Sequence, residues 1–462
     1  MKFDIIILGS GPGGYVTAIR AAQLGFKTAI VEKENLGGVC LNWGCIPTKA
    51  LLKSAQVYNY IKHASTYGIS VEEPVADLIS MVARSREVAE SMSKGVEFLM
   101  RKNDVTVIKG FGKVLPEKKV EILHDDGLIS IIDADHIIIA TGARTRQLPN
   151  LPIDGKKVIG YRQAMTLKKQ PESMIVVGSG AIGVEFAYFY HSIGTKVTIV
   201  EYLDRIVPTE DEEVSKHLAR SFKKSKIKVM TSAELLSVDT SADKVKALLK
   251  TKKGEQILEA DIVLSAVGIQ TNLEGIGLEE TGIQVEKGKI LVDDYYRTNI
   301  EGYYAIGDVI NTPALAHVAS AEGITCVEQI AGHHPEKIDY NNIPGAIYTS
   351  PEVASTGYTE KQAIEAGHEI LVGKFPFSAS GKAKAAGATE GFVKVIIDKK
   401  YGEILGAHMI GANVTEMIAE IVAARKAEAT GHTILKSIHP HPTMSEAVME
   451  AVADAYGEVI HL

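Results

Sequence analysis

The sequence predicts an α/β protein that contains one parallel-sheet module twice and ends in a separate α+β domain. A short apolar run that stops at glycines, a helical pattern and a second apolar run follow one another near Ile5–Glu32, which is typical of a buried β–turn–α–β unit. The same order recurs near Met174–Glu201, which indicates a duplicated domain and not a short-period repeat. Beyond Gly268 the pattern changes, and residues 343–462 carry no further glycine turn of this kind.

The elements of each copy follow from the spacing of apolar residues. The first copy is expected to contain strands at Ile5–Leu8, Thr28–Val31 and His136–Ala140, and helices at Tyr15–Leu24 and near Val82–Lys102. The second is expected to contain strands at Met174–Val177, Lys196–Val200 and Ile262–Ala266, and a helix at Val184–Ser192. Later segments predict a strand within Glu301–Asp308, a helix at about 317–331, strands at Phe392–Ile397 and Ile404–Met409, and a helix at Thr415–Glu428. With a Pro-containing linker at 148–152, we predict domains at 1–147, 148–268, 269–342 and 343–462.

Composition excludes several classes of protein. The 462 residues are enough for about three domains of ordinary size. Lys and Arg number 50 and Asp and Glu 57, for a net charge of −7 without a basic block, so we expect no nucleic-acid partner. No apolar run approaches the roughly 18 residues of a membrane span, so we expect no membrane association. The start Met1–Leu8 resembles no signal or transit peptide, which favours a cytoplasmic protein.

The two glycine turns have the pattern that binds a pyrophosphate. They consist of Gly9, Gly11 and Gly14 in the first copy and Gly178, Gly180 and Gly183 in the second. Such a turn lets the backbone approach the phosphates, while the following helix offers free N–H groups and the positive end of its dipole. One turn could simply join a strand to a helix, but two matching copies predict two Rossmann-like dinucleotide-binding domains.

An acidic residue follows each turn at the same distance. Glu32 and Glu201 stand eighteen residues after the last glycine of their turns, each at a strand end, where a carboxylate can accept hydrogen bonds from a ribose. A carboxylate repels a 2′-phosphate, so the second site should prefer NAD to NADP. Arg205 could favour the phosphate instead, although a single loop arginine is more often a solvated charge.

Two of the three cysteines lie close together. Cys40 and Cys45 precede a helical pattern at Ala50–Ile61, and a thiol at a helix N-terminus has a lowered pKa. The pair is therefore expected to be redox-active. Zinc binding is the alternative, but it needs four ligands, and no second Cys pair or nearby His completes a site. Cys326 is expected to be a buried apolar residue, and no metal site is expected.

The segment Gly37–Lys49 resembles the active-site segment of the pyridine nucleotide–disulfide oxidoreductases, and the similarity covers nearly the whole chain. The motif at 439–446 resembles the family's C-terminal motif, in which the His before Pro-Thr is the catalytic base and the Glu five residues later orients it. Here these residues are His441 and Glu446. His439 is interpreted as an auxiliary loop histidine.

The resemblance implies a role for each matching residue. Cys40 and Cys45 would form the redox-active disulfide, with His441 and Glu446 supplied by the second subunit of a homodimer. FAD would be held by Gly9, Gly11, Gly14, Glu32, Lys49, Thr141, Gly142, Asp308, Ala316 and His317. NAD would be held by Gly178, Gly180, Gly183, Glu185, Glu201 and Gly268. The 343–462 domain would form the dimer interface.

Within the family, the segment is most similar to members that oxidise dihydrolipoyl groups. The implied partners are lipoyl-bearing proteins of 2-oxoacid dehydrogenase complexes or of the glycine cleavage system. Glutathione and trypanothione reductases instead resemble Cys-Val-Pro-Lys-Lys where this chain has Cys45–Lys49, and mercuric reductases carry further cysteines near the C-terminus. A glutathione-reductase-like enzyme and a non-catalytic flavin-binding scaffold are the alternatives.

Overall fold

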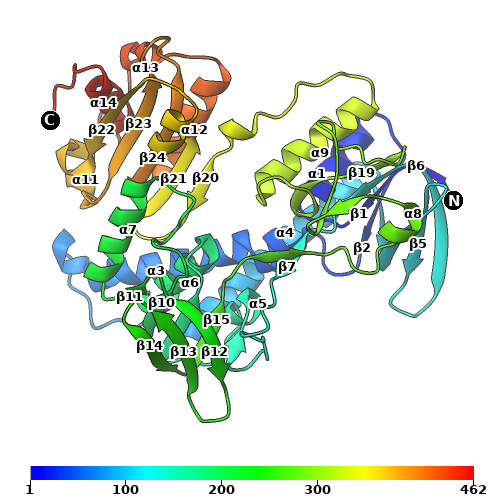
Figure 1. Cartoon of the computed structure of the whole chain (residues 1–462), viewed down its shortest axis with the longest axis horizontal. Coiled ribbons are helices and arrows are strands. Elements are labelled where there is room, and N and C mark those ends of the chain that lie inside the picture. Colours follow the sequence, from blue (N-terminus) through cyan, green and yellow to red (C-terminus); the bar gives the residue numbers. More distant parts are fainter. Residues whose placement is uncertain (1) are drawn as a thin grey trace. The chain divides into compact units, whose positions relative to one another are not determined.

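The computed structural model describes residues 2–462, and Figure 1 shows its helices and strands. The chain falls into two compact units. The first consists of the chain up to Leu51, with Ile79–Gln147 and Gly268–Tyr340; the second consists of Leu52–Leu78, Leu148–Val267 and Asn341–Leu462. Each unit therefore collects segments that are far apart in sequence.

The first unit is built on a sheet in the order β3-β2-β1-β6-β5-β4, with β19 also paired to β6. Strand β1 (Lys2–Leu8) lies between β2 (Thr28–Glu32) and β6 (Ile129–Ile139), parallel to both. The side chains of residues 5–8 are fully or almost fully buried, as expected for a parallel strand covered on both faces. The C-terminal half of β6 pairs with β19 (Tyr303–Ala305), so the 269–342 stretch adds a strand to the first sheet.

The remaining elements of this unit have the following bounds. The strands are β3 (Thr106–Lys109), β4 (Phe111–Leu115), β5 (Lys119–Leu123), β7 (Ala143–Thr145), β16 (Ile269–Thr271), β17 (Val285–Glu286) and β18 (Lys289–Ile290). The helices are α1 (Pro12–Gln23), α2 (Gly38–Trp43), α8 (Leu278–Thr281), α9 (Ala316–Ile330) and nearly all of α4 (Leu78–Lys102). Helix α3 (Cys45–Lys62) begins in this unit and ends in the second.

The second unit contains three sheets. Strands β11-β10-β9-β15-β8 form a parallel sheet, β12-β13-β14 an antiparallel one, and β20-β21-β24-β23-β22 the antiparallel sheet near the C-terminus, which α12 and α14 contact (Figure 1). The strands are β8 (Val158–Ile159), β9 (Ser173–Val177), β10 (Lys196–Val200), β11 (Lys228–Met230), β12 (Glu234–Asp239), β13 (Val245–Thr251), β14 (Gly254–Ala260), β15 (Ile262–Ser265), β20 (Gly345–Ile347), β21 (Glu352–Gly357), β22 (Ile370–Pro376), β23 (Phe392–Asp398) and β24 (Ile404–Gly411). The helices are α5 (Tyr161–Ala164), α6 (Ala181–Ser192), α7 (Glu212–Lys224), α10 (Glu360–Glu365), α11 (Gly381–Ala386), α12 (Val414–Lys426), α13 (Gly431–Lys436) and α14 (Glu446–Ala455).

The predicted fold class is confirmed: the chain has two modules with parallel strands and a C-terminal α+β domain. Four helices, however, begin three or more residues earlier than predicted. Helices α1, α3, α4 and α6 start at Pro12, Cys45, Leu78 and Ala181, three to five residues before the predicted starts. Glycines lower helix propensity, but here they lie in the first turn of α1 and α6, where close packing on the strand requires them.

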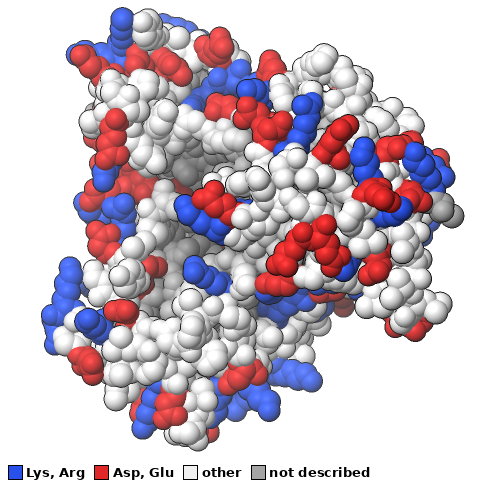
Figure 2. Space-filling view, turned by 45° about the vertical axis from the view of Figure 1, so that its right-hand side comes forward, with Lys and Arg blue, Asp and Glu red and all other residues white. Residues whose placement is uncertain are grey.

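Charge is mixed over the surface. On the face in Figure 2, basic and acidic side chains lie interspersed, which matches the similar totals of 50 basic and 57 acidic residues. Among the residues that the structure describes, no helix combines the length and the hydropathy that a membrane crossing requires.

Candidate active site

The two glycine turns are structural copies of each other. Gly9 and Gly178 each have a φ of +97°, and a Cβ on either would lie 2.4 or 2.3 Å from a carbonyl oxygen of the neighbouring strand connection. A Cβ on Gly14 would lie 1.9 Å from the Gly9 oxygen, and one on Gly183 would lie 2.1 Å from the Gly178 oxygen. The protein's own packing therefore requires the first and last glycine of each turn.

The middle glycines have a different explanation. A Cβ on Gly11 or Gly180 would meet no protein atom within 4 Å, and both residues have a negative φ. Each stands at the N-cap of its helix without a side-chain cap, so the first N–H groups of α1 and α6 are available to an anion. Absence of a side chain here leaves room for a bound pyrophosphate, which fits a dinucleotide at each turn.

The two acidic residues are held in the same way in both copies. Oε2 of Glu32 accepts from the N–H and the hydroxyl of Ser10 at 2.9 and 2.6 Å, and Oε2 of Glu201 accepts from the N–H and the hydroxyl of Ser179 at the same two distances. Each Oε1 also accepts a backbone N–H two residues further along the chain. The carboxylates are thus fixed at the strand ends before any ribose binds.

Ser10 and Ser179 were missed in the sequence analysis. Both occupy the first variable position of the glycine motif, so a serine at the same place in both copies was the available signal. Their hydroxyls orient Glu32 and Glu201, the acidic residues that the sequence predicts to accept hydrogen bonds from a ribose.

Thr141 and Gly142 lie where β6 leads into β7. The Thr141 hydroxyl donates to the Asn272 carbonyl at 2.8 Å, and the Asn272 side chain donates back to the Thr141 carbonyl at 3.0 Å. Gly142 has a φ of +66° and Gly268 one of +107°, and a Cβ on either would meet no atom within 4 Å. The structure thus joins the predicted Thr141-Gly142 segment to the chain after Gly268.

The Gly307–Asp308 segment forms a short 3₁₀ turn after β19. Its Gly307 N–H donates to Oε2 of Glu322 at 2.6 Å, and Glu322, on α9, is completely buried. Burial raises the pKa of Asp308, and Lys289 partly opposes that rise. Ala316 and His317 are the first two residues of α9, which packs so closely on α1 that a Cβ on Gly323 would lie 1.8 Å from the Thr17 hydroxyl.

The two cysteines lie on consecutive helices, Cys40 in α2 and Cys45 at the first position of α3. Both carry thiols in the structure, with Cys45 exposed and Cys40 half-buried. A hydrogen bond with Cys45 and burial raise the pKa of Cys40, although Lys49 favours its thiolate. The pKa of Cys40 is therefore raised and not lowered as predicted, although Cys40 also lies in the first turn of a helix, α2.

The remaining predicted residues of the cysteine and nicotinamide regions lie in different units. Lys49 is in the first turn of α3. Glu185, on α6, is 4% exposed, and its Oε1 accepts the Tyr348 N–H at 3.0 Å. Cys326 is completely buried, and burial raises its pKa, so it is a poor nucleophile.

The C-terminal motif brings its two predicted residues together. Nδ1 of His441 lies 2.9 Å from Oε1 of Glu446, and Oε2 of Glu446 accepts the Thr443 N–H at 2.8 Å. Burial opposes ionisation of Glu446, but the Thr443 N–H and the two histidines His441 and His439 hold its pKa below the usual range. The His441 side chain is 79% exposed, so its other ring nitrogen is accessible to a substrate.

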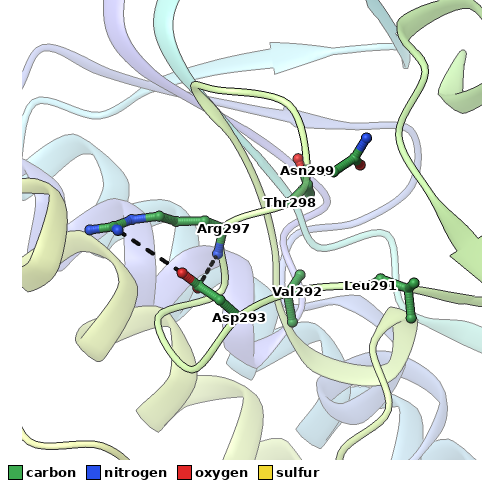
Figure 3. Close-up of a pocket in the computed structure, with 6 residues that line it drawn as sticks. All are labelled: Leu291, Val292, Asp293, Arg297, Thr298 and Asn299. Atoms are coloured by element: carbon green, nitrogen blue, oxygen red, sulfur yellow. Dashed lines mark hydrogen bonds and ion pairs between the residues drawn. The ribbon is translucent and has the colours of Figure 1, made fainter.

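A pocket elsewhere in the first unit is lined by none of the predicted catalytic or cofactor-binding residues. It has a volume of about 280 Å³ and is lined by Leu291, Val292, Asp293, Arg297, Thr298 and Asn299 (Figure 3). Asp293 accepts the Arg297 N–H at 2.9 Å and forms a 4.0 Å ion pair with the guanidinium of the same residue, so the pocket's charges satisfy each other. Within residues 2–462, no three His, Cys, Asp or Glu side chains are grouped as a metal site would require.

Comparison with known proteins agrees with this arrangement. The model of the pyridine nucleotide-disulphide oxidoreductase family matches residues 3–323, and the model of that family's dimerisation domain matches residues 343–452. The chain belongs to this family, whose members use FAD and NAD, and the two glycine turns fit these cofactors.

The most similar curated relatives share one name, which is narrower than the family. Dihydrolipoyl dehydrogenase of Zymomonas mobilis is 47% identical over 99% of both chains, that of Chlorobaculum parvum 48% over 97% of this chain and 96% of its own, and that of Bacillus subtilis 44% over 100% and 99%. Among solved structures, LpdA from Mycobacterium tuberculosis superposes with a TM-score of 0.91 at 27% identity, covering 98% of this chain and 99% of its own. The flavoprotein disulfide reductase RclA from Escherichia coli, which is induced by HOCl, gives 0.88 at 26% with the same coverage.

Proposed function

We propose that this chain is a dihydrolipoyl dehydrogenase, which oxidises dihydrolipoyl groups to lipoyl and reduces NAD⁺. The observation that carries the proposal is the contact of 2.9 Å between His441 and Glu446, with the imidazole exposed. The full-length identity of 44–48% to proteins of that name supports the choice of substrate.

His441 acts as the general base of the thiol exchange. Glu446 accepts a hydrogen bond from Nδ1–H, which leaves the lone pair on Nε2 directed away from Glu446. Nε2 takes the proton of a dihydrolipoyl thiol, and the ionised Glu446 stabilises the imidazolium that forms. Because the pKa of Glu446 is lowered, it stays ionised throughout the neutral pH range.

The exchange itself transfers two electrons. In the oxidised enzyme, a disulfide joins Cys40 and Cys45. The substrate thiolate attacks Sγ of Cys40 and releases Cys45 as a thiolate. The second substrate thiol then displaces Cys40, so lipoyl disulfide leaves and the enzyme keeps a thiol on Cys40 and a thiolate on Cys45. The substrate loses two electrons, the cysteines gain them, and the two thiol protons pass to His441 and Cys40. The family resemblance supports this order, in which Cys40 is the residue that the substrate attacks.

Residues of the glycine turns hold the cofactors. Bound FAD supplies the chemistry that takes two electrons from the dithiol and delivers them as hydride to NAD⁺. The N–H groups after Gly11 and Gly180 bind the pyrophosphates, and Glu32 and Glu201 accept from the ribose hydroxyls. Lys49, Thr141, Gly142, Asp308, Ala316 and His317 complete the FAD site, and Glu185 and Gly268 the NAD site.

The dimerisation domain supports a homodimer, and we propose that His441 and Glu446 serve the cysteines of the second subunit. In this division, residues 1–147 bind FAD, 148–268 bind NAD, 269–342 complete the FAD site and 343–462 form the interface. Lipoyl-bearing proteins of 2-oxoacid dehydrogenase or glycine cleavage complexes are the proposed partners. The bacterial relatives at 47–48% identity support the cytoplasm as the proposed compartment.

An anaerobic assay of the purified protein with dihydrolipoamide and NAD⁺ tests the proposal. We expect rapid NADH formation, a much slower reaction with NADP⁺ because Glu201 repels a 2′-phosphate, and no oxidation of NADPH by glutathione disulfide. Turnover of glutathione with NADPH would instead indicate a glutathione-reductase-like enzyme. A flavoprotein that reacts with neither substrate would indicate a scaffold.

A further inference from the structure

The loop between α13 and α14 carries two histidines with opposite environments. The His441 side chain is 79% exposed, whereas that of His439 is 8% exposed. The loop contains no helix or strand, so side-chain contacts have to define its conformation. His439 is the more buried of the two and is therefore the candidate for that function.

Both ring nitrogens of His439 have a partner. Nε2 lies 2.7 Å from Oε1 of Glu420, on α12, and Nδ1 lies 3.2 Å from the Ser437 carbonyl oxygen. A carbonyl and a carboxylate can only accept hydrogen bonds. The contact with the Glu420 carboxylate therefore places a proton on Nε2 of His439, which donates it as a hydrogen bond. A hydrogen bond to a carboxylate is charge-assisted and therefore stronger than one between neutral groups. The contact with Glu420 thus fixes the position of the loop relative to α12.

His439 also acts on the carboxylate of Glu446, which orients the base. Among the groups that favour ionised Glu446, the Thr443 N–H and His441 come first and His439 follows. The Thr443 hydroxyl also donates to the Pro440 carbonyl at 2.8 Å, which closes a short turn around His441, directly after His439. A shift of His439 would thus move the loop and weaken the His441–Glu446 contact together.

We propose that the Glu420–His439 ion pair positions His441 for proton abstraction, and that His439 is a positioning residue without contact to the substrate. The inference rests on the proposed function, because it concerns the base of that reaction. It predicts that the pair affects kcat for dihydrolipoamide through His441 alone.

The test is a double-mutant cycle in the full-length, FAD-loaded protein. Glu420→Gln keeps the shape of the side chain but removes its charge. We expect it to lower kcat with dihydrolipoamide by about tenfold, a fraction of what a general base contributes, with little change in KM. Glu420→Asp, which keeps the carboxylate, should lie between wild type and Glu420→Gln. In a His441→Gln background, Glu420→Gln should have no further effect.

The controls separate positioning from folding. NADH oxidation by an artificial acceptor does not use His441, so it should stay unchanged in every variant that is properly folded. Glu416→Gln, one turn earlier on α12 and exposed, should leave both activities at the wild-type level.

Two results would overturn the inference: an undiminished kcat in Glu420→Gln, or the same loss in the His441→Gln background as in wild type. A separate result, full dihydrolipoamide turnover by His441→Gln alone, would refute the proposed base and with it the function assigned to this loop.

Discussion

His441 is defined by its contacts rather than by its type. The chain has 14 histidines, and several of them form contacts with carboxylates. His441 combines such a contact with an exposure of 79%, whereas His439, two residues earlier, is buried against Glu420. An oriented and accessible imidazole is what general-base catalysis requires.

Replacing His441 with Gln should therefore slow turnover with dihydrolipoamide by about 100-fold, the lower end of a general base's contribution. Diaphorase activity, measured as NADH oxidation by an artificial acceptor, should remain. Steady-state kinetics of both reactions provide the measurement. If the variant oxidises dihydrolipoamide at the wild-type rate, another group is the base.

The glycine turns show how one element can combine packing and binding. Gly183 has no room for a Cβ because the Gly178 carbonyl lies in its way, while Gly180 faces open space at the start of α6. The two residues are three positions apart in one motif, but packing requires the glycine at 183, whereas cofactor binding would require the one at 180.

Substitution of each glycine by alanine distinguishes an effect on cofactor binding from an effect on stability. Gly180→Ala should change the free energy of unfolding by less than about 1 kcal/mol, because its backbone conformation suits alanine. It should nevertheless raise the KM for NAD⁺ by about tenfold or more, equivalent to losing roughly 1.4 kcal/mol of binding.

Gly183→Ala, by contrast, should destabilise the protein by about 1–3 kcal/mol, because the strand–helix packing must open. Urea unfolding and NAD⁺ titration of the two variants provide the measurements. Equal stability of the two variants would contradict the steric argument.

Across the second unit, a buried ion pair connects segments that are far apart in the chain. Lys394, on β23, is 1% exposed, and its Nζ lies 3.2 Å from Asp211 and 2.7 Å from Glu360. Burial opposes its charge, but the carboxylates of Glu360, Asp211 and Glu213 raise its pKa. The N-terminus of α7 is thereby fixed to the C-terminal sheet of the same unit.

Lys394→Met should destabilise the protein by about 3–5 kcal/mol, because it leaves Asp211 buried without its partner. Lys374→Met, which removes an exposed pair with Glu213, is the matched control and should cost no more than about 1 kcal/mol. Urea unfolding of both variants measures these values, and an equally small effect of Lys394→Met would mean that the buried pair contributes little.

The pH dependence of this pair has a definite sign. A group whose pKa is raised by folding contributes stability that is present below its unfolded pKa and is lost as the pH rises through the folded one. For Lys394 the contribution should therefore persist from neutral pH up to about pH 10, the ordinary value for lysine.

The proposed sharing of the site between subunits can be tested on the whole dimer. Cys45→Ser and His441→Gln should each abolish most dihydrolipoamide turnover. In a mixed dimer, one site would have both defects and the other would be intact, so purified mixed dimers should regain about half of the wild-type activity of a symmetric dimer. Co-expression with two different tags isolates these dimers. Mixed dimers that stay inactive would place each complete site within one chain.

The sequence alone was sufficient for the fold class, the two cofactor turns and the cysteine pair, because each depends on residues that are close together in the chain. Apolar runs, glycine spacing and short motifs report local conformation directly. Even so, the starts of α1 and α6 were misplaced, since packing overrides the low helix propensity of the glycines in their first turns.

Other features depend on residues that meet only after folding. Residue spacing could not predict the raised pKa of Cys40 or the contact of His439 with Glu420. Nor could it predict the hydrogen bonds that Ser10 and Ser179 donate to Glu32 and Glu201. Lys394 would be expected at the surface of its strand, but carboxylates from α7 and α10 cover it. Burial and hydrogen bonding set the charge and orientation of a group, and both are properties of the folded chain.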